Sequence, residues 1–135
     1  MKFKKILSFV LLIFCILLVG GFFSKKSCEH PDIKVSVPDI ITSPLIIEGE
    51  ARGTWYFEAD FPVLLLDENG DQIALAIAFA QDYWMTEDFV PFKVELKFNV
   101  QKRIQRGILV FKKDNPSDLP EYDDEFRIPV MVGHR

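Results

Sequence analysis

Alternation of apolar and polar residues is the feature that most constrains what this chain can fold into. In the run "PFKVELKFNV", residues 91–100, every second residue from Phe92 to Val100 is apolar, and the residues between them are charged or asparagine. A period of two places the apolar side chains on one face of a β-strand. The run therefore predicts a strand with one buried face and one solvated face.

A second alternating run, "QIALAIAFAQ", sets large apolar residues against alanines over residues 72–81. The small residues suggest close packing on their face of the strand. Just upstream, an Asn69-Gly70 pair lies between two apolar runs, and Asn-Gly favours the positive φ angles of a tight hairpin turn. We therefore expect Pro62–Asp67 and Gln72–Gln81 to pair antiparallel.

Five further short segments are rich in Val, Ile and Phe and are bounded by Pro, Gly, Asn or Asp. They are Ile33–Val37, Leu45–Arg52, Thr54–Asp60, Gly107–Lys113 and Glu125–Val132. Seven or eight short strands within about a hundred residues predict an all-β fold, an antiparallel β-sandwich. Beyond the N-terminal region no apolar helical stripe is present, and the nearest approach to a helix is a turn at Tyr83–Asp88.

The N-terminal region predicts one transmembrane helix. Ile6–Phe23 is apolar apart from Ser8 and follows three lysines, and at ~1.5 Å per residue its eighteen residues reach about 27 Å, close to the hydrocarbon thickness of a bilayer. The core is longer than the 7–15 residues usual in a cleaved signal peptide, which favours an uncleaved anchor over that alternative. We expect an anchor at residues 1–28, a linker at 29–34 and a β-domain at 35–135, in a single-pass cell-membrane protein whose C-terminal domain is extracytoplasmic.

Charge divides the chain at the same boundary. The first 28 residues carry five lysines and no acid, whereas the remainder carries twenty acidic residues against eleven Lys and Arg, a net charge of −9. An acidic domain without a basic stripe argues against nucleic acid as a partner, because phosphate neutralisation dominates that binding.

Catalytic motifs are not evident. The two histidines are His30, in the expected linker, and His134, beside the C-terminus. The chain has no Gly-x-Ser-x-Gly elbow, phosphate-cradling glycine loop or His-x-x-x-His pair. We therefore expect a protein that is not an enzyme and needs no cofactor.

Two aromatic clusters, "TWYFEADFP" and "QDYWMTEDFVPF", supply candidates for ligand binding. Aromatic side chains at strand edges and in loops can stack on sugars or anchor a protein partner. The ligand-binding candidates are Arg52, Trp55, Tyr56, Tyr83 and Trp84. For Trp84 the favoured interpretation is that it closes one end of the core.

An acidic stretch, "DNPSDLPEYDDE", raises the question of a metal. Its candidate oxygen ligands are Asp114, Asn115, Asp118, Asp123, Asp124 and Glu125. The spacing is not that of a known calcium loop, and Pro116 and Pro120 stiffen the backbone that calcium would have to gather around itself. Turn formation by Asp and Asn is the favoured interpretation, so no metal ligand is assigned and a calcium-dependent module is a weaker alternative.

Three stretches together resemble a known family. "SPLIIEGEARGTWYFEADFPVLLLDENG", "DYWMTEDFVPF" and "GILVFKKDNPSDLPEYDDEFRIPV" are similar, in order and spacing, to the immunoglobulin-like domain of bacterial spore-germination proteins, a module often found beside a GerMN module. The resemblance covers about residues 35–132. The matching positions are Gly49, Ala51, Arg52, Gly53, Trp55, Phe57, Glu58, Ala59, Trp84, Met85, Phe92, Asp114, Asn115, Pro116, Ser117, Pro120, Asp124 and Glu125.

The resemblance implies an immunoglobulin-like β-sandwich outside the membrane that acts as a non-catalytic accessory module. It implies a cell-envelope protein or glycan as the partner. The leading hypothesis is a membrane-tethered interaction module of the bacterial cell envelope. A carbohydrate-binding module that uses exposed aromatic residues is the alternative.

Overall fold

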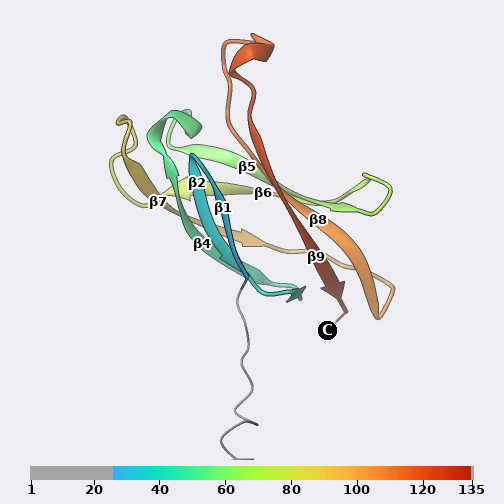
Figure 1. Cartoon of the computed structure of the whole chain (residues 1–135). Helices are drawn as coiled ribbons and strands as arrows, with labels where there is room; N and C mark the ends of the chain where they lie inside the picture. Colours follow the sequence, from blue (N-terminus) through green and yellow to red (C-terminus); the bar gives the residue numbers. More distant parts are fainter. Residues whose placement is uncertain (1–25, 135) are drawn as a thin grey trace, which may run out of the picture.

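A single continuous sheet of nine strands forms the part of the chain that the computed structural model describes, residues 26–134 (Figure 1). The strands are β1 Lys26–His30, β2 Ile33–Val37, β3 Ile40–Ile41, β4 Leu45–Arg52, β5 Asp60–Asp67, β6 Gln72–Ala80, β7 Phe89–Leu96, β8 Ile104–Lys112 and β9 Glu125–Gly133. Their order in the sheet is β1-β2-β4-β7-β6-β5-β8-β9-β3. Every pairing is antiparallel except that of β3 with β9. The all-β class is therefore confirmed, with β1 and β3 in addition to the strands that were predicted.

The sheet bends so that its two halves enclose a core (Figure 1). The ring of Phe92 on β7 lies 5.1 Å from that of Phe61 on β5 and 6.1 Å from that of Phe111 on β8, measured between centroids. Strands β7 and β8 are not neighbours in the sheet, so the contact between Phe92 and Phe111 crosses the interior. Burial of such large side chains is the main stabilising contribution to a domain of this size.

The alternation predicted for residues 91–100 is present in β7. Phe92, Val94 and Leu96 are buried, whereas Lys93 and Glu95 between them are exposed. The strand ends at Leu96. Just beyond it, the Phe98 N–H donates a 2.9 Å hydrogen bond to the Ser43 hydroxyl.

The predicted hairpin is also confirmed, because β5 and β6 pair antiparallel along their lengths. Gly70 in the connection has φ of +84°, a conformation that glycine adopts without steric cost. One oxygen of the Asp67 carboxylate accepts hydrogen bonds from the N–H groups of Asn69 and Asp71 at 2.8 and 2.9 Å. These bonds hold the turn in place.

The strand predicted at Thr54–Asp60 is wrong. The chain instead forms a 3₁₀ turn, η1, at Gly53–Trp55, and then a tight reversal in which Glu58 and Ala59 have φ of 51° and 69°. Phe57 and Asp60 exchange backbone hydrogen bonds of 3.0 and 3.2 Å across this reversal. The chain must turn here because β4 ends at Arg52 and β5 belongs to the other half of the sheet.

The predicted anchor falls mainly on residues 1–25, which lie outside the described residues. Within residues 26–134 no helix has the length and apolar character needed to cross a bilayer. The expected linker, residues 29–34, is part of the sheet instead: Glu29 and His30 finish β1, and Ile33 begins β2 with a fully buried side chain. The polar residues of this range suggested a linker and not a strand, because only one of the two faces of β2 is apolar.

Candidate functional site

The outer face formed by β4 and β7 carries charged side chains that form ion pairs with one another. Exposed ion pairs join Lys34 to Glu50 at 3.6 Å, Lys93 to Glu48 at 3.9 Å and Lys97 to Glu95 at 3.5 Å. Pairs of this kind contribute little stability but keep a surface well solvated. Ile46, 57% exposed, also lies on this face, where it pairs with Glu95.

The hairpin of β5 and β6 has the opposite character, and the cause lies in the pairing of the two strands. Buried Phe61, Val63 and Leu65 on β5 lie directly opposite alanines on β6, namely Ala78, Ala76 and Ala74. Large side chains on one strand leave room only for small ones on its neighbour, because interiors are close-packed. The alanine face of β6 therefore points inward, as its small residues suggested.

As a consequence, the large side chains of β6 point outward. Leu75, Ile77 and Phe79 are 55%, 37% and 56% exposed. Beside them on β5, the half-buried Leu64 pairs with Leu75, and Pro62 pairs with Ile77. We call this set the outer apolar face; its members are Pro62, Leu64, Leu66, Leu75, Ile77 and Phe79.

A groove runs along one side of the outer apolar face. The β6–β7 ladder is only two residue pairs long, Phe79 with Lys93 and Ala80 with Phe92. Where pairing stops, Leu75, Ala76 and Ile77 line one wall of a groove whose other wall carries Glu95 and Lys97. The nine residues of β6 include no charge and no proline, the two devices with which proteins usually protect a strand edge.

The aromatic candidates do not form one patch. Trp55 and Tyr56 are 0% and 4% exposed, and the Tyr56 hydroxyl donates a 2.7 Å hydrogen bond to the Val90 carbonyl. Burial raises the pKa of Tyr56 well above its ordinary value. Neither side chain is available to stack on an external sugar.

The other three candidates lie around the β6–β7 connection and the end of β4. Tyr83 is 64% exposed, whereas Trp84 is half-buried and packs against the core. Arg52 places its guanidinium carbon 4.0 Å from the centroid of the Phe89 ring, a cation–π contact. Of the aromatic candidates only Tyr83 is thus largely exposed.

The acidic stretch between β8 and β9 is organised by Asn115. Its side-chain amide donates to the Leu119 carbonyl at 2.9 Å and to the Asp123 carboxylate at 2.8 Å, and its side-chain oxygen accepts from the Ser117 N–H at 3.1 Å. Asp118 takes a φ of 57°, and a second 3₁₀ turn, η2, covers Pro120–Tyr122. These are the turn bonds expected of Asx residues.

Two acidic residues at the ends of this stretch have different surroundings. Asp114 is partly desolvated, and burial, followed by the negative charge of Asp60, raises the pKa of Asp114 above its ordinary value. Glu125, by contrast, accepts a 2.8 Å bond from Arg127 Nε on the exposed side of β9. The anionic form of Asp114 is therefore less favourable in the folded chain than in water.

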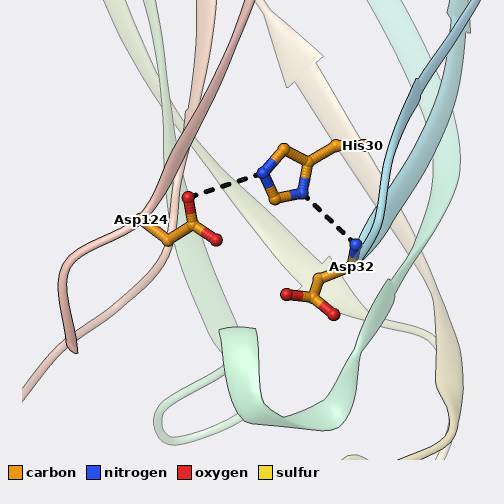
Figure 2. Close-up of side chains that lie close together, drawn as sticks. All are labelled: His30, Asp32 and Asp124. Carbon is orange, nitrogen blue, oxygen red and sulfur yellow. Dashed lines mark hydrogen bonds and ion pairs between the residues drawn. The ribbon is translucent and has the colours of Figure 1, made fainter.

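Asp124, the residue before β9, belongs to a cluster that sequence reasoning missed. His30 Nε2 lies 3.5 Å from its Oδ1, and the Asp32 N–H donates to His30 Nδ1 at 3.3 Å (Figure 2). The side chains of His30, Asp32 and Asp124 converge from two connections far apart in the sequence (Figure 2). No local pattern signals such a meeting, because it depends on the pairing of distant strands.

The strands, the enclosed core and the short connections define a small all-β domain of the immunoglobulin-like class. The chain belongs to the family described as the immunoglobulin-like domain of bacterial spore germination, which matches residues 33–119. The resemblance seen in the sequence is thereby confirmed. Comparisons with curated proteins and with solved structures gave no match.

Proposed function

We propose that the chain is a membrane-tethered, extracytoplasmic interaction module of the bacterial cell envelope, built as an immunoglobulin-like β-sandwich. The outer apolar face is the observation that carries this proposal. Contiguous exposed apolar surface commonly marks an interaction site. Here it occupies one face of the domain, while the outer face of β4 and β7 is charged.

The partner is a protein segment with its own apolar side chains. Leu75, Ile77 and Phe79 supply large side chains that are each more than a third exposed, and covering apolar area stabilises a complex by about 25 cal/mol per Å² before the costs of association. The uncharged edge of β6 beside the groove is suited to an extended segment, which would add main-chain hydrogen bonds to those side-chain contacts.

The tether rests on the apolar segment Ile6–Phe23. Because β1 begins at Lys26, the domain would lie within about 10 Å of the bilayer surface, at up to ~3.5 Å per residue. Its partners are then membrane-proximal proteins. Protease added to intact spheroplasts should digest the domain, and a protected, soluble product would contradict the topology.

The glycan-binding alternative has less support. Of its four aromatic residues, Trp55 and Tyr56 are buried, and Trp84 is half-buried against the core. A sugar would have to be held mainly by Tyr83. The outer apolar face offers more contact area and no hydroxyl-binding groups, which suits a protein better than a polysaccharide.

The size of the native complex tests the proposal. The tagged full-length chain, solubilised in mild detergent from membranes of its own bacterium, should run larger than the purified chain in the same detergent. The double variant Leu75→Ser/Phe79→Ser should run at the size of the purified chain. Ile46→Ser is the matched control, because Ile46 is equally exposed at 57% but lies on the charged face; loss of the complex in this variant as well, or its retention in the double variant, would contradict the proposal.

A further inference from the structure

The cluster of His30, Asp32 and Asp124 brings three metal-ligating side chains together at one end of the domain (Figure 2). His30 ends β1, Asp32 lies in the turn before β2, and Asp124 precedes β9. One ligand atom from each side chain lies within 4.8 Å of those of the other two. Figure 2 shows both carboxylates directed toward the space beside the imidazole ring.

The imidazole is held in place by an apolar floor. Its centroid lies 5.5 Å from the Trp55 ring in an edge-to-face contact and 5.6 Å from the Phe126 ring. Trp55 itself is fully buried. His30, Asp32 and Asp124 are all half-buried, so the donors are shielded on one side and open to solvent on the other.

We propose that His30, Asp32 and Asp124 form a binding site for a divalent transition metal of the Zn²⁺ type. One imidazole nitrogen with two carboxylate oxygens is a donor set that suits zinc and its neighbours, whereas calcium prefers oxygen donors alone. The two carboxylates balance the charge of the ion. Water completes the coordination on the open side.

Metal binding requires a defined proton shift in the imidazole. The neutral ring accepts the Asp32 N–H at Nδ1 and therefore carries its proton on Nε2, facing Asp124. When Nε2 binds the metal, that proton is replaced and the ring carries its proton on Nδ1. The long 3.3 Å hydrogen bond from the Asp32 N–H to Nδ1 is then given up.

The donors need only a small closure to bind. Zinc holds nitrogen and oxygen ligands at about 2.0–2.2 Å, so tetrahedral ligands lie roughly 3.4 Å apart. The separation of 3.5 Å between His30 Nε2 and Asp124 Oδ1 is already close to this value. Asp32 lies in a hairpin turn, where rotation of its side chain brings in the third oxygen.

A bound ion would join the β1–β2 hairpin to the β8–β9 connection. These segments are distant in the sequence, and within residues 26–134 the edge strand β1 pairs only with β2. The metal would therefore link the edge strand β1 to the residue that precedes β9. This role is independent of the outer apolar face.

Fluorescence of Trp55 gives a direct test, because the imidazole lies against its ring. The chain has two tryptophans, so Trp84→Phe in the full-length chain, purified in mild detergent, leaves Trp55 as the sole indole. Co²⁺, with a partly filled d shell, should quench this fluorescence to saturation. Zn²⁺, whose d shell is filled, should compete and restore it.

Variants distinguish this site from other acidic groups. Asp124→Asn and His30→Gln should each weaken Co²⁺ binding by on the order of tenfold or more. Asp118→Asn, in the same connection at a φ that asparagine tolerates, should leave binding unchanged. Absence of saturable quenching, or equal quenching in folded Asp124→Asn and His30→Gln as judged by circular dichroism, would overturn the proposal.

Discussion

Phe61 on β5 lies directly opposite Ala78 on β6, and both side chains are fully buried. This pairing fixes which face of β6 points inward, and it thereby places Leu75, Ile77 and Phe79 on the surface. A larger side chain at position 78 would need part of the space that the Phe61 ring occupies. We expect Ala78→Leu to lower the free energy of unfolding by about 1–3 kcal/mol.

Urea denaturation measures this effect, with Leu75→Ala as the control on the same strand. Leu75 is 55% exposed, so its truncation should change the free energy of unfolding by less than about 0.5 kcal/mol. A large loss for Leu75→Ala and none for Ala78→Leu would mean that β6 is turned the other way.

Gly53 marks the point where β4 gives way to η1 beneath the β6–β7 connection. A Cβ at this position would overlap the backbone oxygens of Trp84 and Thr86, and backbone atoms cannot move aside as a side chain can. Gly53→Ala should cost roughly 1–3 kcal/mol of stability in thermal or urea unfolding. Gly133→Ala is the control, because its nearest atom is a Thr42 methyl at 3.3 Å; an equal loss there would contradict the explanation.

The hydroxyl of Tyr56 and the Val90 carbonyl form a buried pair at 2.7 Å. Tyr56→Phe keeps the ring but leaves the carbonyl without this donor. Its desolvation is then uncompensated, so we expect a loss of about 1–2 kcal/mol in the free energy of unfolding. Unchanged stability in Tyr56→Phe would show that water reaches the Val90 carbonyl.

Asp114 predicts a dependence of stability on pH. Burial and the charge of Asp60 raise the pKa of Asp114 in the folded chain, so the folded state binds this proton more tightly than the unfolded state. The contribution of Asp114 to stability therefore falls as pH rises from about 4, the ordinary pKa of aspartate, through the raised folded value, and it is constant above that.

Asp114→Asn removes this unfavourable charge and should be more stable than the parent at pH 7. The advantage should shrink on acidification toward pH 4, as seen in urea midpoints across that range. In an Asp60→Asn background the advantage at pH 7 should be smaller, since one cause of the raised pKa is gone. An advantage that does not vary with pH would contradict the electrostatic explanation.

Local composition, turn residues and alternation predicted most of the strands. Ile33–Val37 and Leu45–Arg52 match β2 and β4 in both bounds, and Asn69-Gly70 marked the β5–β6 hairpin. The stretch Thr54–Asp60 misled because aromatic residues favour strands, whereas its φ angles are set by the need to reverse the chain.

The outer apolar face and the His30–Asp124 cluster both depend on residues from other segments of the chain, which alternation within one strand does not reveal. The pattern of β6 defines two faces, but only Phe61, Val63 and Leu65 on β5 decide that the alanines pack inward. Trp55 and Tyr56 were predicted to bind a ligand because aromatic residues are common at interfaces. In the structure both side chains are buried, just before the chain reverses at Glu58 and Ala59. The meeting of His30 with Asp124 likewise follows from tertiary structure alone.

The central claim is that the outer apolar face contacts a protein in the cell envelope. A photo-crosslinking amino acid at position 75, tested in living cells of the source bacterium, measures this contact most directly, and the same amino acid at position 46 is the control because Leu75 and Ile46 are 55% and 57% exposed. We predict a discrete crosslinked product from position 75, lost when Phe79→Ser is added, and none from position 46. No product from position 75, or the same products from both positions, would contradict the claim.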